Sequence, residues 1–136
     1  MNLRISVPAI ALCLLTSACS VTHTKQCPVG EQKLSQESLY FGTKMPSGFV
    51  TEQQWASFLT TSVTPKFPQG LTVVNASGQW QGNNGKIIKE QSYVLTLVHD
   101  NSQEKIRAIS EITELYKVQF QQEAVLRVQN DVCVSF

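Results

Sequence analysis

Hydrophobic residues alternate with polar ones at 71–81 and at 124–134, and residues 87–99 form a second long pattern typical of a strand. A period of two is typical of β-strands with one buried face, and a long run rich in β-branched and aromatic residues is typical of strands as well, so each segment predicts a strand. An aromatic and apolar run at 39–41 stops at Gly42 and predicts a shorter strand before them. The sequence therefore predicts four strands.

Two segments between these strands have the three- and four-residue spacing of an amphipathic helix. The first follows Thr51 and Glu52, which are typical of a helix N-terminus, and Pro65 ends it. Ser102 begins the second. Their apolar positions are Trp55, Phe58, Leu59 and Val63 in the first helix and Ile106, Ile109, Ile112, Tyr116 and Phe120 in the second.

The sequence Asn-Asn-Gly at 83–85 separates the two long strands and predicts a tight hairpin. With the last two of these residues as the loop, Gln79 pairs with Glu90 and Trp80 pairs with Lys89. Since paired residues share a face, this register gives the hairpin one apolar and one polar face. The apolar face holds Val74, Ala76, Tyr93, Leu95 and Leu97, and the polar face holds Ser77, Gln79, Glu90 and Ser92.

The predicted order is therefore βαββαβ, the ferredoxin-like arrangement of the α+β class. In it, two helices cover one face of a four-stranded antiparallel sheet. The alternative is a different α+β order in which the final strand pairs elsewhere.

The N-terminus predicts export. Residues 1–18 have one basic residue, an apolar run and then small residues, as in a signal peptide, and the apolar run at 5–15 is shorter than the roughly 20 residues of a membrane-spanning helix. Residues 15–19, Leu-Thr-Ser-Ala-Cys, resemble a bacterial lipobox, which implies a lipid on Cys19. Ser20 favours the outer membrane, facing the periplasm, over inner-membrane retention. The alternative is ordinary secretion with an unmodified Cys19.

The residues that follow predict a lipidated tether at 19–37 and a single α+β domain at 38–136, because the tether is polar and lacks periodicity. Beyond the lipidation site, two cysteines remain, Cys27 and Cys133. An even pair in an exported protein predicts one structural disulfide. The alternative is two unpaired thiols.

Composition excludes several functions. Lys and Arg number 11 against 10 Asp and Glu, and loss of Arg4 with the signal peptide makes the two equal, so the chain lacks the basic excess that nucleic-acid binding needs. The two histidines, His23 and His99, stand in distant contexts, with His99 predicted as a solvated strand-end residue, and we predict no metal site. No glycine-rich phosphate loop is present, and we predict no cofactor.

Several longer stretches together resemble a bacterial family of secreted lipoproteins of unknown function. They are LYFG at 39–42, VTPKFPQGLTV at 63–73, GQW at 78–80, FQQEAVL at 120–126 and VCVSF at 132–136. The resemblance implies an exported domain with these limits, and it implies no catalytic residues.

One polar group is a candidate site. Gln79, Glu90 and Ser92 form a strip on the sheet face away from the helices, where a carboxylate can orient a ligand or accept a proton. Trp80 is predicted on the opposite face. The alternative is an ordinary cross-strand pair on a wetted face. The rest of that face is predicted to be apolar, with Leu71, Val73, Val94, Val98 and Tyr40.

These features favour a non-catalytic binding or assembly domain held at the cell envelope by its lipid. Its open sheet face would form a homodimer or bind a peptide or small molecule, because an exposed apolar face is usually covered. The alternative is a small periplasmic enzyme that uses Glu90, with Gln79 and Arg127 orienting an anionic or carbonyl substrate.

Overall fold

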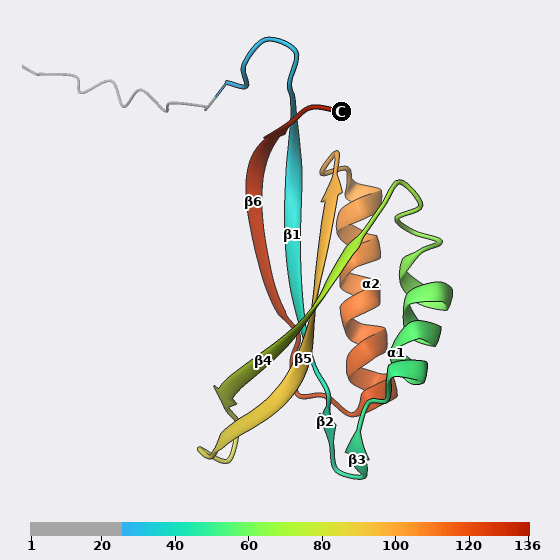
Figure 1. Cartoon of the computed structure of the whole chain (residues 1–136), viewed down its shortest axis with the longest axis vertical. Coiled ribbons are helices and arrows are strands. Elements are labelled where there is room, and N and C mark those ends of the chain that lie inside the picture. Colours follow the sequence, from blue (N-terminus) through green and yellow to red (C-terminus); the bar gives the residue numbers. More distant parts are fainter. Residues whose placement is uncertain (1–25) are drawn as a thin grey trace, which may run out of the picture.

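The computed structural model describes residues 26–136, so the predicted signal peptide and Cys19 lie outside the described residues. Four strands form one antiparallel sheet in the order β4-β5-β1-β6 (Figure 1). The predicted ferredoxin-like α+β arrangement is confirmed, with two helices on one face of the sheet. The strands are β1 (Gln32–Gly42), β4 (Thr72–Gln81), β5 (Ile87–His99) and β6 (Leu126–Val134), and a small hairpin of β2 (Lys44–Met45) and β3 (Gly48–Phe49) follows β1.

Both helices begin at the predicted residues. Before α1 (Glu52–Phe58), the Thr51 hydroxyl accepts a hydrogen bond from the Gln54 amide, and the Gln54 side chain accepts one from the Thr51 amide. A π-helical segment, η1 (Leu59–Val63), extends α1. Ser102 caps α2 (Gln103–Phe120). Within residues 26–136, no helix is long and apolar enough to cross a membrane.

The core lies between the two helices and the central strands β1 and β5. Aromatic rings fill the part of the core near the end of β1, where Trp55 stacks on Tyr93 with ring centroids 4.4 Å apart. The Tyr116 hydroxyl donates a hydrogen bond to the Gly42 carbonyl oxygen, 2.9 Å away, and so ties α2 to the end of β1. The largest fully buried apolar side chains are Tyr116, Phe41, Phe58, Phe120, Leu39, Leu95, Leu97, Ile109, Ile112 and Val63.

The predicted register of the β4–β5 hairpin is wrong by one residue. Gly78, not Gln79, pairs with Glu90, and Gln79 pairs with Lys89. The cause is the turn: the Gly82 amide donates to the Lys86 carbonyl, so three residues form the loop instead of two. The shift moves Val74 and Ala76 to the face away from the helices, and it turns Leu71 and Val73 toward the core.

Strand β1 begins at Gln32, inside the segment predicted to be a tether. The sequence pattern does not reveal this start, because two polar residues, Ser35 and Glu37, occupy inward positions of the strand and are buried. The pattern does not reveal which face of β6 is buried either. Its apolar residues Leu126 and Val128 lie on the open face, while Arg127 shares the helix-covered face with Glu37.

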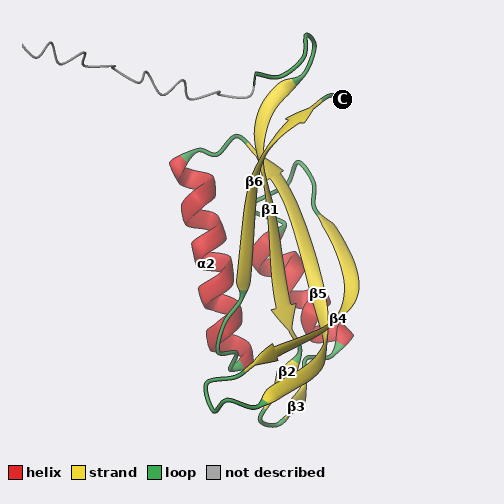
Figure 2. Cartoon of the chain, turned by 90° about the vertical axis from the view of Figure 1, so that its left-hand side faces the viewer, coloured by secondary structure: helices red, strands yellow, loops and turns green. Residues whose placement is uncertain are grey.

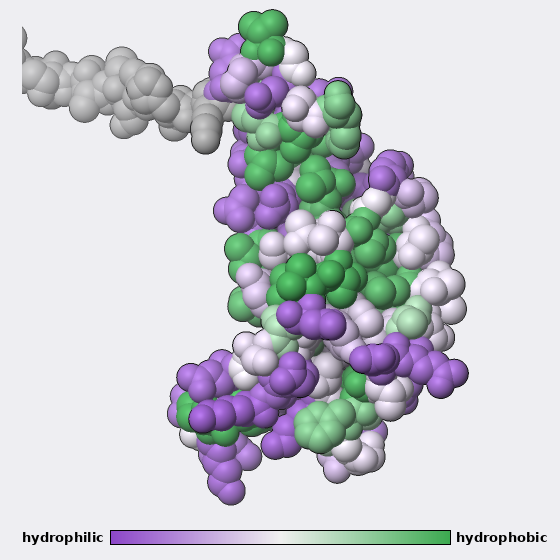
Figure 3. All heavy atoms as spheres, in the orientation of Figure 1, coloured by the Kyte–Doolittle hydropathy of each residue, from purple (hydrophilic) through white to green (hydrophobic). Residues whose placement is uncertain are grey.

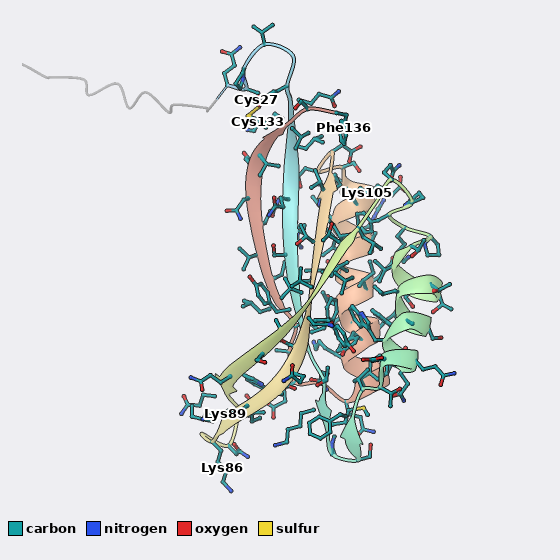
Figure 4. All side chains as sticks on the ribbon, in the orientation of Figure 1. Cys27, Lys86, Lys89, Lys105, Cys133 and Phe136 are labelled. Carbon is teal, nitrogen blue, oxygen red and sulfur yellow. A yellow bond between two sulfur atoms is a disulfide. The ribbon has the colours of Figure 1, made fainter. Side chains whose placement is uncertain are left out.

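The structure joins Cys27 and Cys133 in a disulfide, with their Cα atoms 5.5 Å apart. Figure 4 shows this bond at the end of the sheet where β1 begins and β6 ends. The segment before β1 is thereby fixed to the edge strand of the sheet.

Candidate functional site

The sheet face opposite the helices is uncovered, as the view onto that face in Figure 2 shows. Its middle is apolar: the exposed fractions of Val74 and Leu126 are 54% and 60%, and that of Tyr40 is 39%. Val94, Val98 and Val128 belong to the same face. Hydrophilic side chains gather instead at the far end of the β4–β5 hairpin (Figure 3).

A cavity of about 220 Å³ opens on this face beside the end of β1. Gly78 of β4 leaves space open on this wall because it has no side chain, and the space beside Gly42 of β1 is occupied by the Glu90 carboxylate. The cavity is lined by these glycines and by Tyr40, Gln79, Trp80, Glu90, Ser92, Gln122, Ala124 and Leu126.

The carboxylate of Glu90 is held by two hydrogen bonds. Its Oε1 atom accepts from the Trp80 indole nitrogen, 2.9 Å away, and its Oε2 atom accepts from the Lys44 backbone amide, 2.7 Å away. The carboxylate also lies against Gly42, where a Cβ atom would meet Glu90 Oε1 at 2.5 Å. Only glycine at position 42 therefore permits this arrangement without a shift of Glu90.

The negative charge of Glu90 affects the pKa of Tyr116 in the core. Burial, and after it the charge of Glu90, raises the pKa of Tyr116 well above its usual value. Tyr116 is the residue that bonds the Gly42 carbonyl. The tyrosine therefore remains a neutral hydrogen-bond donor that supports the edge of the cavity.

Glu90 has no cationic partner in the described part of the chain. No side-chain nitrogen of a Lys, Arg or His among residues 26–136 lies within 4.0 Å of its oxygens, although five contacts of this kind with other carboxylates exist. Lys89 and Lys44 line the two neighbouring hollows beside Glu90. Figure 4 shows Lys86 and Lys89 toward the tip of the β4–β5 hairpin. The carboxylate is thus fixed by neutral donors alone.

Three of the four predicted site residues, Gln79, Glu90 and Ser92, line the cavity. The one-residue register shift, however, turns the Gln79 side chain to the sheet face opposite those of Glu90 and Ser92, so the predicted strip of three residues on one face is wrong for Gln79. Arg127 does not join them, because it lies on the helix-covered face. Sequence reasoning placed Trp80 on the wrong face, and only the correct hairpin register reveals its contact with Glu90. Among residues 26–136, no group of three or more His, Cys, Asp or Glu residues is placed to hold a metal ion.

A second polar cluster lies inside the core. Arg127 donates from Nε and Nη2 to the two oxygens of Glu37, at 2.8 and 2.6 Å, and the Glu37 side chain is fully buried. His99 is 5% exposed, so its prediction as a solvated residue is wrong. Its Nδ1 atom accepts from the Asn101 amide, and its Nε2 atom, 3.7 Å from Glu37 Oε1, has no hydrogen-bond partner.

Burial lowers the pKa of His99 below its usual value, against the opposing charge of Glu37. The neutral ring stacks edge-on against Phe67, with centroids 5.9 Å apart. This cluster is closed off from the Glu90 cavity by the sheet itself. It gives Arg127 a structural partner, Glu37, on the helix-covered face.

The family model described as "Protein of unknown function (DUF3574)" matches residues 36–136. A comparison with curated proteins finds no match. Among solved structures, a phage SAM lyase in complex with S-methyl-5'-thioadenosine is 11% identical with a TM-score of 0.57, covering 83% of this chain and 95% of that one. CutA from Synechococcus elongatus PCC7942 is 11% identical with a TM-score of 0.52, covering 77% and 83%. At such low identity, the likeness shows the ferredoxin-like fold alone.

Proposed function

The chain belongs to the DUF3574 family, whose function is unknown, and we propose that it is a binding domain of the bacterial cell envelope that takes a small ligand in the Glu90 cavity. The observation that carries this proposal is the fixed carboxylate in an apolar hollow. Ligand sites are concave and mostly apolar, with a few polar groups held in place. The cavity has this composition, and the uncovered sheet face leaves it open to solvent.

We infer the cellular location and the lipid anchor from the N-terminal sequence and from the disulfide. Residues 1–18 are the signal peptide, Cys19 carries the lipid, and the protein faces the periplasm from the outer membrane. A disulfide between Cys27 and Cys133 supports export, because such bonds persist in oxidising compartments. The tether runs from Cys19 to the start of β1 at Gln32.

Binding is favoured over catalysis by the residues around the carboxylate. Among residues 26–136, the lining contains no histidine, cysteine, lysine or arginine that would act with Glu90 as a second acid, base or nucleophile. The enzyme alternative needs Arg127 beside Glu90, whereas Arg127 is bonded to Glu37 on the other face.

A fragment screen tests the binding site. Amide and indole signals of the ¹⁵N-labelled mature chain would be followed by NMR during addition of a library of small organic fragments. We expect hits to concentrate on Trp80, Ser92 and their neighbours, and to disappear in Gly78→Val, which fills open space on the cavity wall.

Asn130→Val is the matched control. It places a valine on the same sheet face, at the position of β6 that pairs with Gln36, outside the cavity. It should leave the hits unchanged. If no fragment perturbs the cavity, or if hits survive Gly78→Val, the proposed binding site is wrong.

A separate experiment tests the proposed lipid anchor on Cys19. Mass spectrometry of the protein extracted from the envelope should show a mature chain that begins at a diacylglyceryl-modified Cys19. Cys19→Ser should lose the lipid mass and leave the membrane fraction. An unmodified Cys19 in the wild-type protein would contradict the lipid anchor.

A further inference from the structure

We propose that the ligand of the Glu90 cavity is a small organic cation, an amine or quaternary ammonium ion with an apolar body. This inference rests on the function proposed above and names the chemical class of its ligand. It is drawn from three properties of the cavity: an unneutralised carboxylate, aromatic walls and a lining without positive charge.

The first property is the state of the carboxylate. Glu90 accepts hydrogen bonds from two neutral donors, the Trp80 indole and the Lys44 amide. These bonds fix its position, but they leave its charge uncompensated, since no cationic nitrogen of residues 26–136 lies within 4.0 Å. A carboxylate in an apolar hollow attracts a positive charge more strongly than one in bulk water, because the local dielectric is lower.

The second property is the pair of aromatic side chains. Tyr40 of β1 and Trp80 of β4 line the same cavity as Glu90. Aromatic faces attract cations through their quadrupole, and recognition of quaternary ammonium groups commonly uses such rings. A carboxylate combined with two aromatic rings therefore favours a cation whose charge is spread over carbon-bearing groups.

The third property excludes other ligands. No Lys or Arg side chain from the described part of the chain lines the cavity, so an anion would meet the Glu90 charge without compensation. Ca²⁺ and Mg²⁺ prefer six or more oxygen ligands, and the lining from residues 26–136 offers a single carboxylate. The volume of about 220 Å³ is below the roughly 300–1,000 Å³ of pockets for drug-sized ligands, so the cation is small.

Leu126 at the start of β6 and Ala124 just before it provide the surface for the apolar body of the ligand, while Ser92 and Gln122 offer hydrogen bonds to a hydroxyl or amide. The charged end would lie between Glu90 and the two rings. This arrangement predicts that charge, and not shape alone, decides which ligands bind.

Two probes of equal shape separate charge from shape: choline and its neutral carbon isostere 3,3-dimethyl-1-butanol. Titration of each into the ¹⁵N-labelled mature chain is followed at the Trp80 indole signal, with the buried Trp55 indole as the internal reference for folding. We expect choline to bind at least tenfold more tightly than the isostere.

Glu90→Gln should remove the preference for choline, because the amide keeps the size and one oxygen of the side chain but loses the charge. Glu104→Gln, at an exposed position in the first turn of α2, is the matched control and should keep the preference. If Glu90→Gln unfolds, Gly78→Val provides the second test, since it should block choline while the Trp55 signal is retained.

The outcomes distinguish the two proposals. If both probes bind with equal affinity and Gly78→Val blocks them, the cation inference is wrong and the binding site stands. If neither probe nor any fragment perturbs Trp80, the proposed function is wrong as well.

Discussion

Replacing Arg127 by methionine should destabilise the protein by about 3 kcal/mol at pH 8. The change keeps the length and apolar stem of the side chain but removes the guanidinium from the fully buried Glu37. Breaking a buried ion pair by removing one partner costs about 3–5 kcal/mol, because the remaining charge stays buried and unpaired. The Arg127 side chain is 30% exposed, so we expect the lower end of this range.

The loss should be smaller at pH 5.5, because His99 can replace the guanidinium. In the wild-type protein, burial first, and the charge of Arg127 in addition, lowers the pKa of His99, so the stability linked to this group is full above the unfolded pKa of about 6.5 and declines as the pH falls. In Arg127→Met, the lowering charge is gone and the folded-state pKa of His99 rises. Protonated His99, with Nε2 3.7 Å from Glu37 Oε1, then pairs with the carboxylate.

Urea denaturation of the oxidised protein at both pH values measures these losses, and NMR titration of the His99 ring follows its pKa. Lys33→Met is the control, since it breaks an exposed ion pair with Asp131 between the same two strands, and such pairs contribute about 0–1 kcal/mol. The reasoning is refuted if Arg127→Met costs no more than Lys33→Met, or if its cost is the same at pH 8 and pH 5.5 while the pKa of His99 stays unchanged.

Two further predictions concern the disulfide and the cavity. Cys27→Ser and Cys133→Ser should each lower the melting temperature, with a loss of up to about 4–5 kcal/mol in the free energy of unfolding for so long a loop. Calorimetry should find the double variant no less stable than either single variant, and a further large loss of stability in the double variant would contradict this. Gly42→Ala should cost about 1.5–3 kcal/mol by displacing the hydrogen-bonded Glu90 carboxylate, whereas Gly78→Ala, whose Cβ would meet nothing closer than 3.7 Å, should be nearly neutral; equal effects in urea denaturation would argue against a Glu90 fixed beside Gly42.

Periodicity was sufficient to predict the architecture. The predicted and observed limits of β5 coincide at 87–99, a long run rich in β-branched residues that follows a tight turn. Thr51 and Ser102 marked the helix starts because their side chains satisfy backbone amides that the first turn leaves without partners. Such signals are local, so a single sequence contains them.

The parts that were missed depend on contacts distant in the sequence. The register of the β4–β5 hairpin depends on the hydrogen bond from the Gly82 amide to the Lys86 carbonyl oxygen. A register shifted by one residue would place Trp80 on the face opposite Glu90 and prevent their hydrogen bond. Glu37 looks like a tether residue until Arg127, 90 positions later, is seen to pair with it. A polar side chain buried by a remote partner breaks the alternation from which strands are inferred.

The disulfide determines how the domain would respond to mechanical load. A force applied to the segment before Cys27 divides at that residue, because one path continues along the backbone into β1 and the other crosses the bond into β6. These two strands are neighbours and antiparallel, so both are pulled along their length from the same end. Strand β1 therefore cannot be peeled from β6 starting at this end, because the disulfide holds the two strand ends together.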